Sequence, residues 1–100
     1  MSYRYALAQH GLTLATRPIA ESLRLKLTEQ AAEFELLELD FTDILGISSS
    51  FADELVARLA EESQAGKVKF DIAVSGASSE VDGVVSRAVE RRGAKLVQLN

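Results

Sequence analysis

The stretch from residue 36 to residue 59, which reads LLELDFTDILGISSSFADELVARL, constrains the fold more than any other part of the chain. Its first residues, 36–41, form a short apolar run that turn residues end, and such a run is typical of a strand buried in a parallel sheet. Phe51, Leu55 and Leu59 then recur every four residues, which predicts a helix with one apolar face. We therefore expect a buried strand, a serine-rich loop and a helix that packs against the sheet.

Serines mark the start of that helix. Ser50 followed by Asp53 has the spacing of a capping box, in which the serine side chain accepts a hydrogen bond from the backbone three residues on. Ser48 and Ser49 could cap the helix almost as well. The same spacing recurs at Ser79 and Asp82, and it predicts the start of another helix there.

The rest of the chain continues an alternation of strands and helices. Loosely alternating apolar residues near the N-terminus predict two short strands about a turn at His10–Gly11. The first helix is expected to turn inward a stripe formed by Ile19, Leu23, Leu27 and Ala31. The expected elements are strands at 3–8 and 12–15, a helix at 17–32, the strand at 36–41, a helix at 51–64, a strand at 68–74, a helix at 79–92 and a strand at 96–99.

This order, β-β-α-β-α-β-α-β, predicts an α/β fold with a mixed, mostly parallel sheet of about four to five strands and three helices. No linker or internal repeat divides the sequence, so we expect a single domain over residues 1–100.

Composition excludes several classes of function. The formal net charge is −4 and no run is dense in lysine or arginine, which disfavours a nucleic-acid partner. The absence of cysteine excludes disulfides and cysteine-ligated zinc. No window approaches the roughly 18 apolar residues of a membrane span. We therefore expect a soluble, cytoplasmic protein that needs no cofactor or metal.

The segment LELDFTDILGISSSFADEL resembles the hallmark segment of STAS domains, the fold of bacterial anti-sigma factor antagonists. It is closer still to a STAS-like family of unknown function whose members tend to read LDF, a short loop and then SFADEL. The resemblance covers about residues 12 to 92. It implies a STAS-like fold and a non-enzymatic regulatory role in signalling, exercised by binding another protein.

In the antagonists, a histidine-kinase-like ATPase, the anti-sigma factor, phosphorylates a serine at the start of this helix. Aligned along the strand, that serine falls on Ser49, and Ser48 stands where the family usually has aspartate. The glycine–leucine–glycine that usually follows is replaced by Phe51, Ala52 and Asp53. The resemblance thus implies Ser49, and secondarily Ser48, as phosphorylation candidates. We expect a partner-binding surface made of Ser48, Ser49, Ser50, Asp53 and Glu54.

Other interpretations of these residues remain open. The serines could serve only as cap and loop residues. Oxygen ligands suitable for Mg²⁺ are present in Asp40, Asp43, Asp53 and Glu54, although acids at a strand end and a helix start need no ion. The only histidine, His10, would have to serve any histidine-based triad. The alternative to a binding module is a small α/β enzyme or nucleotide- or anion-binding domain that uses the acidic residues and the 75–79 loop.

Overall fold

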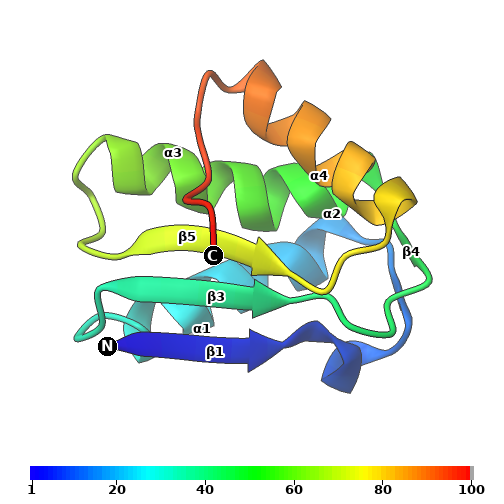
Figure 1. Ribbon diagram of the computed structural model, residues 1–100, viewed down its shortest axis with the longest axis horizontal. Coiled ribbons are helices and arrows are strands. Elements are labelled where there is room, and N and C mark those ends of the chain that lie inside the picture. The colour runs from blue at the N-terminus through cyan, green and yellow to red at the C-terminus, as the bar shows by residue number, and fades with distance from the viewer. Residues whose placement is uncertain (100) are drawn as a thin grey trace.

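The computed structural model describes residues 1–99 and contains a central sheet of three parallel strands. The strands lie in the order β1–β3–β5, so the strand predicted within the 36–59 stretch is the middle one (Figure 1). Tyr5, Leu39 and Val74 share one row of the register across the sheet. The bounds of these strands are β1 Ser2–Ala6, β3 Leu36–Asp40 and β5 Asp71–Ser75.

Helices cover one face of this sheet. The second helix in the chain is continuous from residue 49 to residue 64, but its middle turn, η2, is a π-helix. Because η2 contacts both α1 and α4, the second helix lies between the other two (Figure 1). The bounds are α1 Arg17–Gln30, α2 Ser49–Ala52, η2 Asp53–Ala57, α3 Arg58–Gln64 and α4 Ser79–Arg91.

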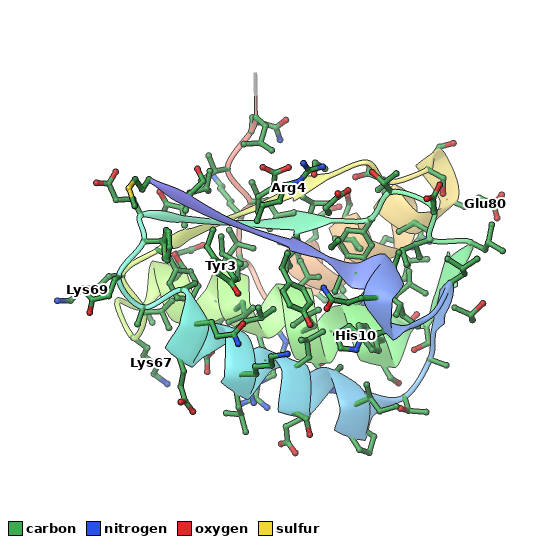
Figure 2. All side chains as sticks on the ribbon, turned by 90° about the horizontal axis from the view of Figure 1, so that it is seen from below. Tyr3, Arg4, His10, Lys67, Lys69 and Glu80 are labelled. Carbon is green, nitrogen blue, oxygen red and sulfur yellow. The ribbon has the colours of Figure 1, made fainter. Side chains whose placement is uncertain are left out.

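The opposite face of the sheet is polar. Arg4 lies on the other side of the strands from α1 (Figure 2), and its guanidinium is 2.7 Å from Asp40 Oδ2. On the same face, the Ser75 hydroxyl donates a hydrogen bond of 2.6 Å to Glu38. The sheet therefore has an apolar face packed on helices and a charged face turned away from them.

The predicted apolar face of the second helix is confirmed. Phe51, Leu55 and Leu59 are all buried, in one core that also contains Leu39 and Phe41 of the middle strand region. The strand–loop–helix unit predicted from residues 36–59 therefore forms the centre of the fold.

The inner face of α1 differs from the prediction at one residue. Leu23, Leu27 and Ala31 are buried as expected, but Ile19 is 54% exposed and Ala20 is buried in its place. Steps of four residues gain about 40° each on a helix of 3.6 residues per turn. A stripe counted back from Ala31 in steps of four therefore drifts off the buried face by the time it reaches Ile19.

The N-terminal expectation of two strands about a tight turn is wrong in its connection. A 3₁₀-helix, η1 (Leu7–His10), follows β1, and Gly11 then adopts a φ of 103°, a conformation that glycine permits. The chain thereby leaves the sheet. Its next strand, β2 (Thr13–Leu14), pairs in parallel with β4 (Gly46–Ile47) instead of with β1.

The last predicted strand, at 96–99, is not formed within the described residues. One backbone hydrogen bond of 2.9 Å, from Val97 N–H to Ile72 C=O, joins this segment to β5. The preceding strand is also shorter than the alternation over 68–74 suggests. The Phe70 carbonyl accepts a hydrogen bond from the Ser63 hydroxyl at 2.8 Å, and β5 begins only at the next residue.

Candidate functional site

The serine loop joins β4 to the second helix, and its first serine is the helix cap. Ser48 has an extended backbone, and its Oγ accepts a hydrogen bond of 3.0 Å from the Phe51 N–H. The same hydroxyl donates to the Ala15 carbonyl at 2.6 Å. The prediction that Ser50 caps this helix is therefore wrong, because Ser50 already lies in the first helical turn. The Ser48 hydroxyl is committed to holding the helix start against the segment before α1.

The next two serines do not fix the helix start. Ser49 and Ser50 are both exposed, and within residues 1–99 neither hydroxyl makes a hydrogen bond to another side chain or to the backbone. The prediction for α4 shifts in the same way, since Ser78 rather than Ser79 caps that helix through a 3.2 Å bond from Val81 N–H.

Leu45, which precedes the serine loop, forms an exposed apolar pair with Leu12. Leu45 is 75% exposed and Leu12 is 46% exposed, and the Leu45 N–H donates to the Leu12 carbonyl at 2.8 Å. Neither residue was expected from the sequence to belong to the site. The sequence gives little sign that Leu45 is exposed, because it directly follows another apolar residue, Ile44, which is buried. Exposed leucines beside exposed serines are features that a protein partner could contact.

Asp53 links the second helix to the ends of α1 and α4. Its carboxylate accepts hydrogen bonds from Arg92 at 2.6 and 2.8 Å and from Arg17 at 3.1 Å. The neighbouring Arg92 is the main cause that lowers the pKa of Asp53 from 3.8 to about 2. Asp53 is therefore ionised and paired, with a partly exposed side chain.

Glu54 points further into the molecule. It is buried, and its oxygens lie 2.9 Å from Arg17 and 3.1 Å from both Arg24 and Arg58. Burial raises the pKa of Glu54, but the hydrogen bonds from Arg17 and Arg24 outweigh this effect and the pKa is lowered. With 3% of its surface exposed, Glu54 offers a partner little to touch; it positions the helix instead.

Four arginines in this cluster were not recognised from the sequence as site residues. Arg17, Arg24, Arg58 and Arg92 come from three helices or helix ends, and each pairs with Asp53 or Glu54. Arg24 could have been recognised from the sequence, because it lies next to Leu23 on the face of α1 that is buried. The turn that carries the two acids is π-helical, a rare geometry that is frequent at functional sites.

The acidic residues do not converge on a metal site. Asp40 Oδ1 accepts hydrogen bonds from the Thr42 hydroxyl at 2.6 Å and the Thr42 N–H at 2.9 Å, and these bonds chiefly lower the pKa of Asp40. Its other oxygen pairs with Arg4, whereas Asp53 and Glu54 pair with the arginine cluster. Within residues 1–99, no group of three potential ligands is close enough to hold an ion.

In the 75–79 loop, the backbone of Gly76 lies close to Asp40 and Thr42. Gly76 has a φ of 70°, and a Cβ atom there would lie 2.8 Å from both Asp40 Oδ1 and the Thr42 nitrogen. At the end of this loop, Ser78 Oγ already accepts a hydrogen bond from the start of α4, at Val81 N–H. His10, the other residue considered for catalysis, contacts the Tyr5 hydroxyl through its Nε2 at 2.5 Å and stacks on the Tyr5 ring.

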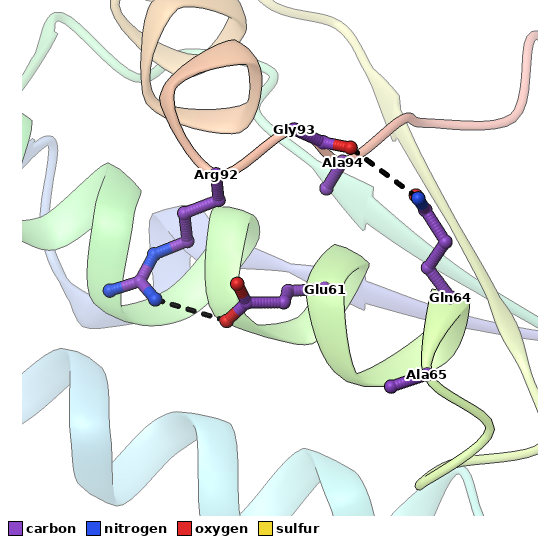
Figure 3. A pocket seen from close by; sticks show the side chains of 6 residues that line it. All are labelled: Glu61, Gln64, Ala65, Arg92, Gly93 and Ala94. Carbon is purple, nitrogen blue, oxygen red and sulfur yellow. Dashed lines mark hydrogen bonds and ion pairs between the residues drawn. The ribbon is translucent and has the colours of Figure 1, made fainter.

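A hollow of about 250 Å³ lies between α3 and the end of α4 (Figure 3). Within it, Arg92 bonds to Glu61 at 3.0 Å, and the Gln64 amide reaches the Gly93 carbonyl at 3.4 Å. None of the predicted site residues lines it. Its polar groups are already paired with one another, so it does not compete with the serine loop as a site.

A family model described as a STAS-like domain of unknown function (DUF4325) matches residues 20–82, more than half of the chain. The chain belongs to this STAS-like family. The match includes the LDF strand, the serine loop and the SFADEL helix start, so the resemblance expected from that segment is confirmed. The parallel strands and three helices of the STAS-like domain agree with the predicted fold class.

Comparison of the STAS-like domain with curated proteins and with solved structures found no significant match. Within residues 1–99, every helix falls short of the length and apolarity that crossing a bilayer requires.

Proposed function

We propose that this STAS-like domain is a non-enzymatic regulatory module that binds another protein through the start of its second helix and is switched by phosphorylation of Ser49. The observation that carries the proposal is that the serines differ in their hydrogen bonding and exposure. Ser48 makes both hydrogen bonds that fix the helix start, so Ser49 is left exposed at a rigid position. Of the two phosphorylation candidates, Ser49 is thus the accessible one.

The proposed partner is a histidine-kinase-like ATPase, as the family resemblance implies. A phosphoserine adds about −1.5 to −2 charges at neutral pH. The domain itself tolerates this charge, because the N–H groups of a helix start favour an anion and Asp53 is already neutralised by Arg17 and Arg92. A partner that covers Ser49 would instead have to desolvate the phosphate. Phosphorylation is therefore expected to release the partner without unfolding the domain.

The proposed partner-binding surface consists of Ser49, Ser50, the neighbouring Leu45 and the exposed part of the Asp53 side chain. The other two residues of the predicted surface, Ser48 and Glu54, support it structurally. Ser48 fixes the helix start, and Glu54 ties the helix to α1 through Arg24. This assignment keeps all five predicted residues but divides them between contact and support.

The test uses candidate kinase-like ATPases encoded in the same genome. Each is incubated with the domain and ATP, and the modified residue is identified by mass spectrometry. For an ATPase that acts on the domain, calorimetry then measures its affinity for variants. Ser49→Asp should weaken binding by about tenfold or more, whereas Ser49→Ala should bind normally and resist phosphate-dependent release.

Ser22→Asp is the control, because Ser22 is an exposed serine on α1, outside the proposed surface. It adds the same charge at an exposed helix position and should leave binding unchanged. Equal affinities of wild type and Ser49→Asp would refute the switch. Micromolar binding of ATP by the isolated domain would instead favour the nucleotide-binding alternative.

A further inference from the structure

A small hollow separates β4 from the first turns of α4, close to the serine loop. Its volume is about 90 Å³. Small-molecule sites generally begin at roughly 300 Å³, so this hollow is of a size for one side chain. It is lined by Leu45, Gly46, Ile47, Glu80, Val81 and Val84.

The hollow has apolar walls and one charge. Leu45, directly before β4, is 75% exposed, and Val84 lines the same hollow from α4 with its residue partly exposed. Glu80 is the single ionisable residue of the lining. Figure 2 shows its side chain projecting from the edge of the molecule, at the same end as β4. The site therefore offers an apolar passage that ends beside a carboxylate.

Glu80 is unpaired within the described residues, unlike several acids of the second helix. Asp53, Glu54 and Glu61 all pair with arginines. Over residues 1–99, Glu80 makes neither an ion pair nor a side-chain hydrogen bond, and the guanidinium of Arg87 lies over Gly83 instead. Its place in the first turn of α4 suits the helix dipole, but the dipole does not account for the apolar hollow beside it.

We propose that this hollow receives a long basic side chain, arginine or lysine, from the bound protein partner. The aliphatic part of such a side chain would lie against Leu45 and Val84, and its charged end would pair with Glu80. Neither a purely aliphatic nor an acidic side chain would satisfy both features. The net charge of −4 favours approach of a basic surface in the same way. The inference deepens the proposed function, on which it rests only for the protein nature of the partner.

The test needs no identified partner. Backbone NMR spectra of the domain are recorded during titration with N-acetyl-argininamide, with N-acetyl-lysinamide and with N-acetyl-citrullinamide. Citrulline has the shape of arginine without its charge. The basic probes should shift the amides of residues 45–47 and 80–84 and bind more tightly than citrulline. Shifts that are scattered, absent or equal for citrulline would overturn the proposal, the last of these indicating an apolar contact alone.

Two variants, each with a matched control, assign the binding to the hollow. Glu80→Gln should weaken binding of the basic probes by up to about fivefold, the upper limit for an exposed ion pair. Asp82→Asn, in the same turn but outside the lining, should not weaken it. Leu45→Ala should also weaken binding. Leu25 is an exposed leucine on α1, and Leu25→Ala should leave binding unchanged. Unchanged affinity of Glu80→Gln would overturn the basic anchor. It would not touch the Ser49 switch, which is measured with the ATPase.

Discussion

Glu54 Oε2 lies 3.1 Å from Arg24 Nη2, between side chains that are 4% and 8% exposed. The two residues are thirty positions apart in the chain. Their pairing fastens the second helix, at its π-helical turn, to α1. It thereby sets the direction in which Ser49 and Ser50 are presented.

Removing one member of this pair should be costly. Arg24→Ala should lower the free energy of unfolding by about 3 kcal/mol, because it strips a buried carboxylate of one of its cations. Arg4→Ala is the matched control, since Arg4 pairs with Asp40 from a side chain that is 63% exposed. Its cost should stay below about 1 kcal/mol. Urea denaturation of the three proteins measures the difference, and equal losses for both variants would contradict the buried role of Arg24.

Gly76 should not accept a side chain. Gly76→Ala would place Cβ 2.8 Å from Asp40 Oδ1 at a φ of 70°, so we expect a loss of about 2–4 kcal/mol in the free energy of unfolding. Gly83→Ala, inside α4, meets only the flexible end of Arg87 at 3.3 Å and should gain up to about 1 kcal/mol. Thermal melts that rank the two variants in the opposite order would show that the 75–79 loop is not packed as described.

The three serines should differ in their effect on stability. Ser48→Ala should cost about 1–2 kcal/mol, because it removes the cap of the second helix and the bond to the Ala15 carbonyl. Ser49→Ala and Ser50→Ala should each change stability by less than about 0.5 kcal/mol. Chemical denaturation measures the free energy of unfolding of the three variants. A larger loss for Ser50→Ala than for Ser48→Ala would restore Ser50 as the cap.

Asp53 should contribute stability that acid removes. Its folded pKa of about 2 lies below the ordinary value of 3.8, so its contribution, about 2 kcal/mol, is complete above about pH 4 and is lost as pH falls toward 2. Asp53→Asn should therefore be less stable than wild type at pH 7, and the difference should shrink between pH 4 and 2. A gap for Asp53→Asn that is independent of pH would rule out the ion pairs as its cause.

Regular patterns in the sequence were enough to place the central elements. The apolar run at 36–41 and the four-residue spacing of Phe51, Leu55 and Leu59 identified the middle strand and the helix that packs on it. Such periodicities are local, because the side of a strand or helix on which a residue lies follows from its spacing along the chain. The three serines at the helix start were recognisable because the spacing of capping residues is also local. The segment around them was also enough to suggest the STAS-like family, which the family match confirms.

Tertiary structure alone decided the roles of the individual site residues. Ser48 is the cap in part because the Ala15 carbonyl, 33 residues earlier in the chain, accepts a hydrogen bond from its hydroxyl. Glu54 looks in sequence like an ordinary acid at a helix start, yet it is buried because Arg17 and Arg24 of another helix close over it. Leu45 is exposed although its neighbour Ile44 is buried. These outcomes depend on groups brought together from distant parts of the chain, and no local spacing contains that information.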